Sequence, residues 1–193
     1  MGLSQYNPNE WRLFIDSSKR SLKCLLLHNG NKFACVSIGH SVILKEHYAT
    51  VKMFLQKLCY DEHNWIACVD LKMVNILLGQ QSGYTIYPCF LCLWDSRADE
   101  VHWEKKNWPV RQKIAVGEKN IINEQLVIRD RIILLPLHIK LGLMKQFVKA
   151  LNKDGTCFNY LCSVYRGLSS EKLKAGIFDG SQIRKLIKDE EFA

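Results

Sequence analysis

At residues 65–72 the chain reads Trp65-Ile66-Ala67-Cys68-Val69-Asp70-Leu71-Lys72, an apolar run of strand length that ends at an aspartate and passes directly into a helical pattern. An earlier stretch, Trp11-Arg12-Leu13-Phe14-Ile15-Asp16, has the same design. A buried strand that ends in Asp carries its carboxylate out of the core at the carboxyl edge of a sheet, where open α/β sheets bind ligands. If the two strands are neighbours, Asp16 and Asp70 form one candidate site.

The surrounding segments predict how these strands are connected. Five strands are predicted, at residues 11–16, 22–28, 33–38, 65–70 and 84–88. Asn29-Gly30 marks a hairpin between the second and third strands, so the first three strands form an antiparallel meander. Apolar residues recur at helical spacing from Leu44 to Leu58. A helix of this length acts as a crossover, which makes the fourth strand parallel to the first.

With a short helix at residues 73–78, this order of elements is that of the ribonuclease-H-like fold. The predicted fold class is therefore α/β, with a mixed sheet in strand order 3-2-1-4-5, crossover helices and a helical insertion near the carboxyl end. We expect this core to occupy residues 1–92. Residues 93–193 are expected to hold a basic and aromatic loop followed by the helical insertion, without an independent second domain.

Composition sets limits on the partners of the chain. The formal net charge is +8, from 27 Lys and Arg against 19 Asp and Glu, so a polyanion is a plausible partner, although net charge speaks first to solubility. No apolar run approaches the roughly 20 residues of a membrane span, and the polar start has no signal-peptide core. Several cysteines lie inside apolar patterns, as free thiols do in reducing compartments. We expect an intracellular protein that does not enter membranes; its oligomeric state is open.

The chemistry that paired aspartates support is phosphoryl transfer at two divalent ions. Carboxylate oxygens favour Mg²⁺ or Mn²⁺ over Zn²⁺, and two such ions about 3.5–4 Å apart activate the attacking oxygen and stabilise the leaving one. A divalent ion, Lys19 or Lys72 is expected to offset the repulsion between the two carboxylates. The simpler alternative makes Asp16 a turn residue and Asp70 the N-cap of the next helix.

A second motif is the Cys-x-x-Cys sequence Cys89-Phe90-Leu91-Cys92. Two thiolates at this spacing can chelate one tetrahedral Zn²⁺, and a closed structural site needs two further ligands. The nearest histidines are His102 and His138, and His138, at the start of a second amphipathic helix, is the better candidate. A redox pair or ordinary packing are the alternatives.

Between these elements, residues 94–131 interleave basic side chains with Trp94, Trp103 and Trp108. Basic and aromatic residues together suit a nucleic-acid surface, where phosphate contacts and base stacking combine. The alternative is a solvated loop that pins its tryptophans against the body of the protein.

Taken together, these motifs resemble the catalytic domains of eukaryotic cut-and-paste transposases of the DDE/DDD type. The run Asp70-Leu71-Lys72, the Cys-x-x-Cys turn and the pair Leu137-His138 carry the resemblance, which covers roughly residues 11–190. It implies that Asp16 and Asp70 are the first two catalytic acids and metal ligands, and that Cys89, Cys92 and His138 bind a metal. It also implies metal-dependent cleavage and strand transfer on DNA, and a nuclear location.

The chain departs from that family at its third carboxylate. No acidic residue near the carboxyl end, among them Asp179 and Asp189, stands in a matching context. Two function classes are therefore open: a metal-dependent nuclease core, and a non-catalytic module that binds nucleic acid or protein. We expect the fold of the first and the activity of the second, with DNA contacted through the basic surface.

Overall fold

The computed structural model describes residues 6–17, 21–43 and 46–192. The chain divides into two compact units, Met1–Leu134 and Leu135–Ala193. The division lies after residue 134 and not at the predicted position after Cys92, because the chain beyond Cys92 returns to the sheet and adds its last strand. None of the helices in the described ranges is long and apolar enough to cross a membrane.

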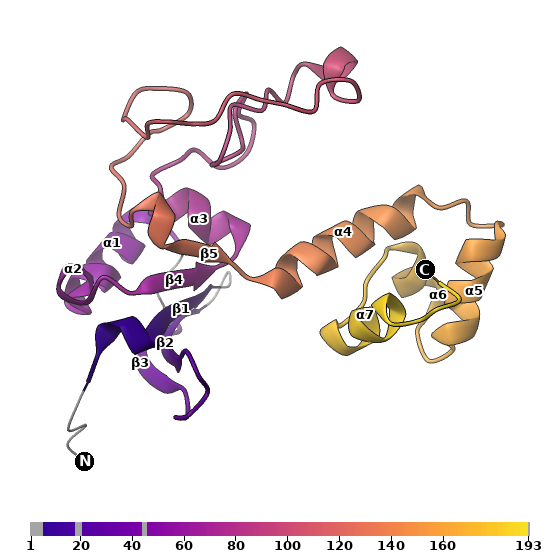
Figure 1. Ribbon diagram of the computed structural model, residues 1–193, viewed down its shortest axis with the longest axis horizontal. Coiled ribbons are helices and arrows are strands. Elements are labelled where there is room, and N and C mark those ends of the chain that lie inside the picture. The colour runs from indigo at the N-terminus through magenta and orange to yellow at the C-terminus, as the bar shows by residue number, and fades with distance from the viewer. Residues whose placement is uncertain (1–5, 18–20, 44–45, 193) are drawn as a thin grey trace. The chain divides into compact units, whose positions relative to one another are not determined.

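The first unit is built on a mixed sheet (Figure 1). Its strands are β1 (Trp11–Ser17), β2 (Leu22–His28), β3 (Val36–Ser41), β4 (Ile66–Val69) and β5 (Ile132–Leu134). Their order is β3-β2-β1-β4-β5. Strands β1, β2 and β3 pair antiparallel, whereas β4 is parallel to both β1 and β5. The predicted α/β class, the strand order 3-2-1-4-5 and the place of β1 between β2 and β4 are confirmed.

Alternating side chains of the strands build the core. In β1, Trp11, Leu13 and Ile15 are buried, and Arg12 and Phe14 between them are more exposed, as expected of a strand with one face against helices. Helices α1 (Tyr48–Lys57), α2 (Tyr60–His63) and α3 (Leu71–Leu77) contribute to this core. Their buried contacts include Val51, Leu55, Tyr60, Met73, Val74 and Leu77. The crossover helix is confirmed as α1, although Leu44 and Lys45 of the predicted range lie outside the described residues.

The predicted fifth strand at residues 84–88 is wrong. Tyr84 is exposed with φ at 46°, and the carbonyls of Tyr87 and Pro88 accept hydrogen bonds from side chains and not from a neighbouring strand. The third strand also begins later than predicted, since Leu26 pairs with Val36 and residues 29–35 form a longer loop than a two-residue hairpin.

We call residues 80–131, between α3 and β5, the arm. Figure 1 shows it extending from the helical side of the sheet, with a short 3-10 helix (Asp99–Val101) at its far end. Its base is fixed at Gly79, which has φ at +66° and lies so close to the arm that a Cβ atom there would be 2.1 Å from the carbonyl oxygen of Asn123. Only glycine fits such a conformation and such a close approach.

In the described residues of the second unit, all regular elements are helices, joined by short loops. The unit contains α4 (Pro136–Ala150), α5 (Thr156–Val164), α6 (Ser170–Lys174) and α7 (Gly180–Ile187). Its own core includes Val148, Phe158, Leu161, Ile183 and Leu186. The side chain of Ser169 caps α6 by accepting from the backbone N–H of Lys172, and Asp179 caps α7 in a capping box with Gln182.

Candidate functional site

The carboxyl ends of β1 and β4 bring the two predicted acids to adjacent positions. The parallel register pairs Leu13 with Ala67 and Phe14 with Cys68. Continuing this register by two residues places Asp16 opposite Asp70 at the same edge of the sheet. The prediction that the two apolar runs are neighbouring strands is confirmed, so the juxtaposition of the two aspartates follows from the fold.

Asp70 also caps a helix. Its Oδ1 accepts a hydrogen bond of 2.8 Å from the backbone N–H of Met73, and its backbone conformation is extended. The first helical N–H groups thus stabilise the carboxylate, and the helix dipole adds to this. The alternative role that the sequence offered for Asp70 is confirmed. Asp16 is an exposed strand residue opposite Lys23 of β2, and the strand continues through Ser17, so it is not a turn residue.

A third carboxylate at this edge, Glu46, was missed from the sequence. Its side chain is only 6% exposed, forms an ion pair with Lys72 and accepts a hydrogen bond from the Ser17 hydroxyl. Ser17 follows Asp16, and Lys72 stands two residues after Asp70, so Glu46 joins the ends of the two strands. The helical pattern predicted from Leu44 to Leu58 includes Glu46, so the sequence assigned it no place at the edge of the sheet. Its position just before α1, at the carboxyl edge of the sheet, is the only signal that could have indicated its role.

Lys72 was predicted to offset the repulsion between Asp16 and Asp70, but it forms its ion pair with a different acid. Lys72 pairs with Glu46, and Lys19 lies outside the described residues. Within the described ranges, no three His, Cys, Asp or Glu side chains are grouped so that they could hold a metal ion. Two Mg²⁺ or Mn²⁺ ions need more oxygen ligands than two carboxylates supply. The edge as it stands does not fit two-metal catalysis, and no cleavage step can be derived from it.

The Cys-x-x-Cys turn lies at the base of the arm. The backbone N–H of Leu91 donates to Sγ of Cys89 at 3.4 Å. Burial, and then the neighbouring Cys89 thiol, raise the pKa of the Cys92 thiol. Two cysteines at this spacing supply two of the four ligands of a tetrahedral zinc site, and the donor set fits Zn²⁺ to that extent. Within the described residues, no third His, Cys, Asp or Glu side chain joins them.

The two histidines differ in their availability. His102 has Nε2 2.6 Å from the carbonyl oxygen of Asp95 and Nδ1 3.4 Å from a carboxylate oxygen of Asp99, and its ring stacks on Trp94. With both ring nitrogens engaged, His102 is a poor ligand. His138 lies in the first turn of α4, in the second unit. The positions of the two units relative to each other are not determined, so its part in the cysteine site stays a prediction.

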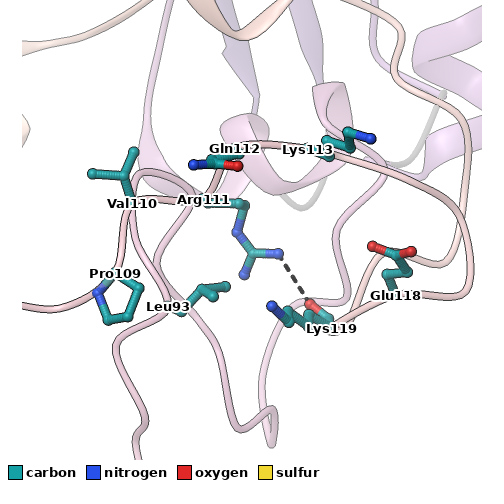
Figure 2. Close-up of a pocket in the computed structure, with 8 residues that line it drawn as sticks. All are labelled: Leu93, Pro109, Val110, Arg111, Gln112, Lys113, Glu118 and Lys119. Atoms are coloured by element: carbon teal, nitrogen blue, oxygen red, sulfur yellow. Dashed lines mark hydrogen bonds between the residues drawn. The ribbon is translucent and has the colours of Figure 1, made fainter.

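Beside the cysteine turn, Arg111 is one of the residues that line a pocket of about 330 Å³ (Figure 2). The residue is only 2% exposed. Its guanidinium donates to the carbonyls of Cys89, Tyr87 and Lys119 and to the side chain of Asn120. Burial lowers its pKa, and the neighbouring Cys89 and Cys92 act in the opposite direction. The sequence pattern had grouped Arg111 with the basic surface, since a single charged residue carries no periodic sign of burial.

The tryptophans of the arm differ in their surroundings. Trp94 is packed against His102, and the ammonium of Lys105 lies 4.2 Å from the ring centre of Trp108. Trp103, by contrast, is 92% exposed near the far end of the arm, with the exposed Lys105 and Lys106 close behind it in sequence. An exposed indole beside ammonium groups can stack on a base while the lysines contact phosphates.

Comparisons with known proteins divide the chain at nearly the same place as the structure. A family model described as a domain of unknown function (DUF8703) matches residues 1–127, and a second domain of unknown function (DUF8704) matches residues 136–193. No curated protein and no solved structure matches the chain.

Proposed function

We propose that this chain, which belongs to the DUF8703 family of domains, is a ribonuclease-H-like domain related to DDE/DDD transposases that binds DNA without cutting it efficiently. The observation that carries the proposal is the parallel register of β1 and β4. Continued by two residues beyond the Phe14–Cys68 pair, this register brings Asp16 opposite Asp70 at one edge of the sheet. In that fold too, the first three strands pair antiparallel in the order β1-β2-β3, and the strands that follow are parallel to β1, as β4 and β5 are here.

The state of the third carboxylate argues for weak activity. Glu46 forms an ion pair with Lys72 and accepts a hydrogen bond from Ser17, so it is not available as a metal ligand. Of the described carboxylates at this edge, Asp16 and Asp70 are left to hold divalent ions. We propose weak binding of Mg²⁺ or Mn²⁺ by this pair and little strand cleavage, because incompletely held ions do not position both the attacking and the leaving oxygen. The second unit provides no carboxylate that the sequence pattern matches to the missing acid.

The proposed contact with DNA lies on the arm. Trp103 offers a flat ring to solvent, and Lys105, Lys106 and Lys113 are exposed on the same arm. Such a surface binds single-stranded or distorted DNA with a strong dependence on salt. With DNA as the proposed partner, we also propose a nuclear location. We further propose that Cys89 and Cys92 hold a structural Zn²⁺ that stiffens the base of the arm.

The test compares binding with cleavage on the same labelled single-stranded and nicked DNA. We expect binding without turnover in Mn²⁺, and turnover that Asp70→Asn abolishes would overturn the inactive assignment. Loss of base stacking costs ~1–3 kcal/mol, so Trp103→Ala should weaken binding about tenfold. Tyr84→Ala is the matched control, since Tyr84 is an equally exposed aromatic residue outside the basic segment. Binding unaffected by Trp103→Ala would remove the arm as the DNA site and favour the protein-binding alternative.

A further inference from the structure

Arg111 is a charged residue with an interior position. It is only 2% exposed, and its hydrogen-bond partners are backbone carbonyls and the Asn120 side chain. In the part of the chain that the structure describes, no carboxylate lies within ion-pair distance of Arg111. A buried cation without a counter-ion lowers the stability of the fold unless other interactions compensate for its lost hydration. The hydrogen bonds of Arg111 show which part of the chain it stabilises.

The guanidinium contacts the backbone on the entry side of the cysteine turn. Nη2 donates to the carbonyl of Tyr87 at 3.0 Å, and Nε donates to the carbonyl of Cys89 at 3.2 Å. The amide of Gln80 reinforces this, donating to the carbonyls of Tyr87 and Pro88 at 3.1 and 3.2 Å. Three consecutive carbonyls are thus held from inside, which leaves the chain free to turn outward at Cys89.

The backbone of Arg111 fixes the exit side of the same turn. Its N–H donates to the carbonyl of Leu91 at 2.9 Å, and Leu93 donates to the carbonyl of Pro109 at 2.8 Å. These bonds form the short antiparallel bridge between Cys92 and Val110. One residue therefore holds both sides of the turn, by its side chain before Cys89 and by its main chain before Cys92.

The geometry also argues against a phosphate on Arg111. A guanidinium has five N–H donors in a fixed fork. Nε uses its one donor, Nη2 uses both of its donors, and Nη1 uses one on Lys119. A single N–H is left, which does not suffice for the bidentate contact by which arginine recognises phosphate. The nearby groups that can become anionic are the thiols of Cys89 and Cys92.

We propose that Arg111 is the positioning residue for metal binding by Cys89 and Cys92. Its fork fixes the turn in the conformation that presents both sulfurs together, before any metal arrives. This inference rests on the zinc site proposed above, and it adds a residue that is not itself a ligand.

The experiment measures metal affinity in the full chain. Co²⁺ is titrated and followed by its thiolate charge-transfer absorption, and Zn²⁺ affinity is obtained by competition with a chromogenic chelator. Groups that orient metal ligands typically change affinity 10–100-fold, and we expect a loss of about that size for Arg111→Met. Arg111→Lys keeps the charge but not the fork and should fall between this variant and the natural protein. Arg97→Met makes the same substitution at an exposed arginine of the arm and should leave the affinity unchanged.

The outcomes separate the inference from its premise. If the natural protein shows no thiolate band that Cys92→Ala removes, the zinc proposal fails. If it shows the band and Arg111→Met binds with equal affinity, the zinc proposal stands and the role of Arg111 is refuted. The melting temperatures of Arg111→Met and of the natural protein are also compared in a chelator, without metal. If Arg111 only stabilises the fold, the substitution lowers the melting temperature but leaves the metal affinity of the folded protein unchanged. Should Arg111→Met not fold, Asn120→Ala, which removes one acceptor of the fork, is expected to weaken metal binding by a smaller factor, and no change would refute the inference.

Discussion

Asp70 occupies a position where one carboxylate can serve two purposes, and two substitutions separate them. It caps α3 through the N–H of Met73, and it faces Asp16 across the parallel register. Asparagine retains the oxygen that accepts the capping bond but loses the charge, whereas alanine loses both. Asp70→Asn therefore tests the acid pair, and the difference between Asp70→Ala and Asp70→Asn tests the cap.

The expected magnitudes follow from these contacts. Loss of an Asp N-cap to alanine costs ~0.5–2 kcal/mol, while asparagine caps about as well as aspartate. Relief of repulsion from Asp16 offsets part of the lost charge–dipole interaction, so Asp70→Asn should stay within about 0.5 kcal/mol of the natural protein. We expect Asp70→Ala to be about 1 kcal/mol less stable. For a chain of this size that difference lowers the melting temperature by about 2–4 °C.

The assay is urea unfolding followed by tryptophan fluorescence, with and without Mn²⁺. All five tryptophans precede residue 135, so the signal reports on the first unit alone. If the acid pair binds Mn²⁺, a tenfold excess over Kd stabilises that unit by ~1.4 kcal/mol. Both Asp70 variants and Asp16→Asn should lose this increment. Asp61→Asn, at an exposed aspartate in the first turn of α2, should keep it.

Two results would refute the reasoning. Equal stabilisation by Mn²⁺ in the natural protein and in Asp70→Asn would show that the ion binds elsewhere, and the paired-acid site would be discarded. Equal stability of the Asp70→Ala and natural proteins without metal would show that the capping bond contributes nothing measurable, contrary to its geometry.

Two further predictions concern other carboxylates. Lys72→Met leaves the Glu46 side chain buried without its ion-pair partner. Because the Lys72 side chain is 56% exposed, we expect the free energy of unfolding to fall by ~1–3 kcal/mol, between the values for exposed and buried ion pairs. Mn²⁺ should stabilise this variant more than the natural protein, because Glu46 becomes free to act as an oxygen ligand, and an equal Mn²⁺ effect in both would contradict this. Hydrogen bonds from Ser181 and from the backbone of Gln182 lower the pKa of Asp179, so its contribution to the second unit is present at neutral pH and is lost as the pH falls through and below the ordinary Asp value of about 3.9. Asp179→Asn should flatten the acid limb of a circular-dichroism pH titration, and an unchanged titration would show that another group controls it.

The central strands could be predicted because their signal is local and repeated. The apolar runs before Asp16 and Asp70 have strand length, and the helix between them is too long for a hairpin, which left parallel pairing as the consistent solution. The fifth strand could not be found in this way. Ile132–Leu134 is short, and its partner in β4 lies on the other side of the arm in sequence. Residues 84–88 have strand-like composition, but the carbonyls of Tyr87 and Pro88 accept hydrogen bonds from the buried side chains of Arg111 and Gln80 and not from a neighbouring strand.

The same limit applies to the site residues. Asp16, Asp70 and the cysteine pair were found because their spacing relates them to one strand end or one turn. Glu46 and Arg111 act through tertiary contacts with residues far away in sequence, and each belongs to a class that is normally solvated. Only coordinates distinguish such a residue from the many charged side chains that cover a helix or a loop.

Helix α3 links the two candidate sites mechanically. Asp70 caps its first turn, and the chain leaving its last turn passes through Gly79 to Gln80, whose amide holds the carbonyls before Cys89. Met73, Val74 and Leu77 are fully buried, so the helix is held firmly in the core. At 1.5 Å per residue, its seven residues span roughly 10 Å. The acid edge and the support of the cysteine turn thus lie at opposite ends of one rigid element, and a substitution that shifts α3 should disturb both sites together.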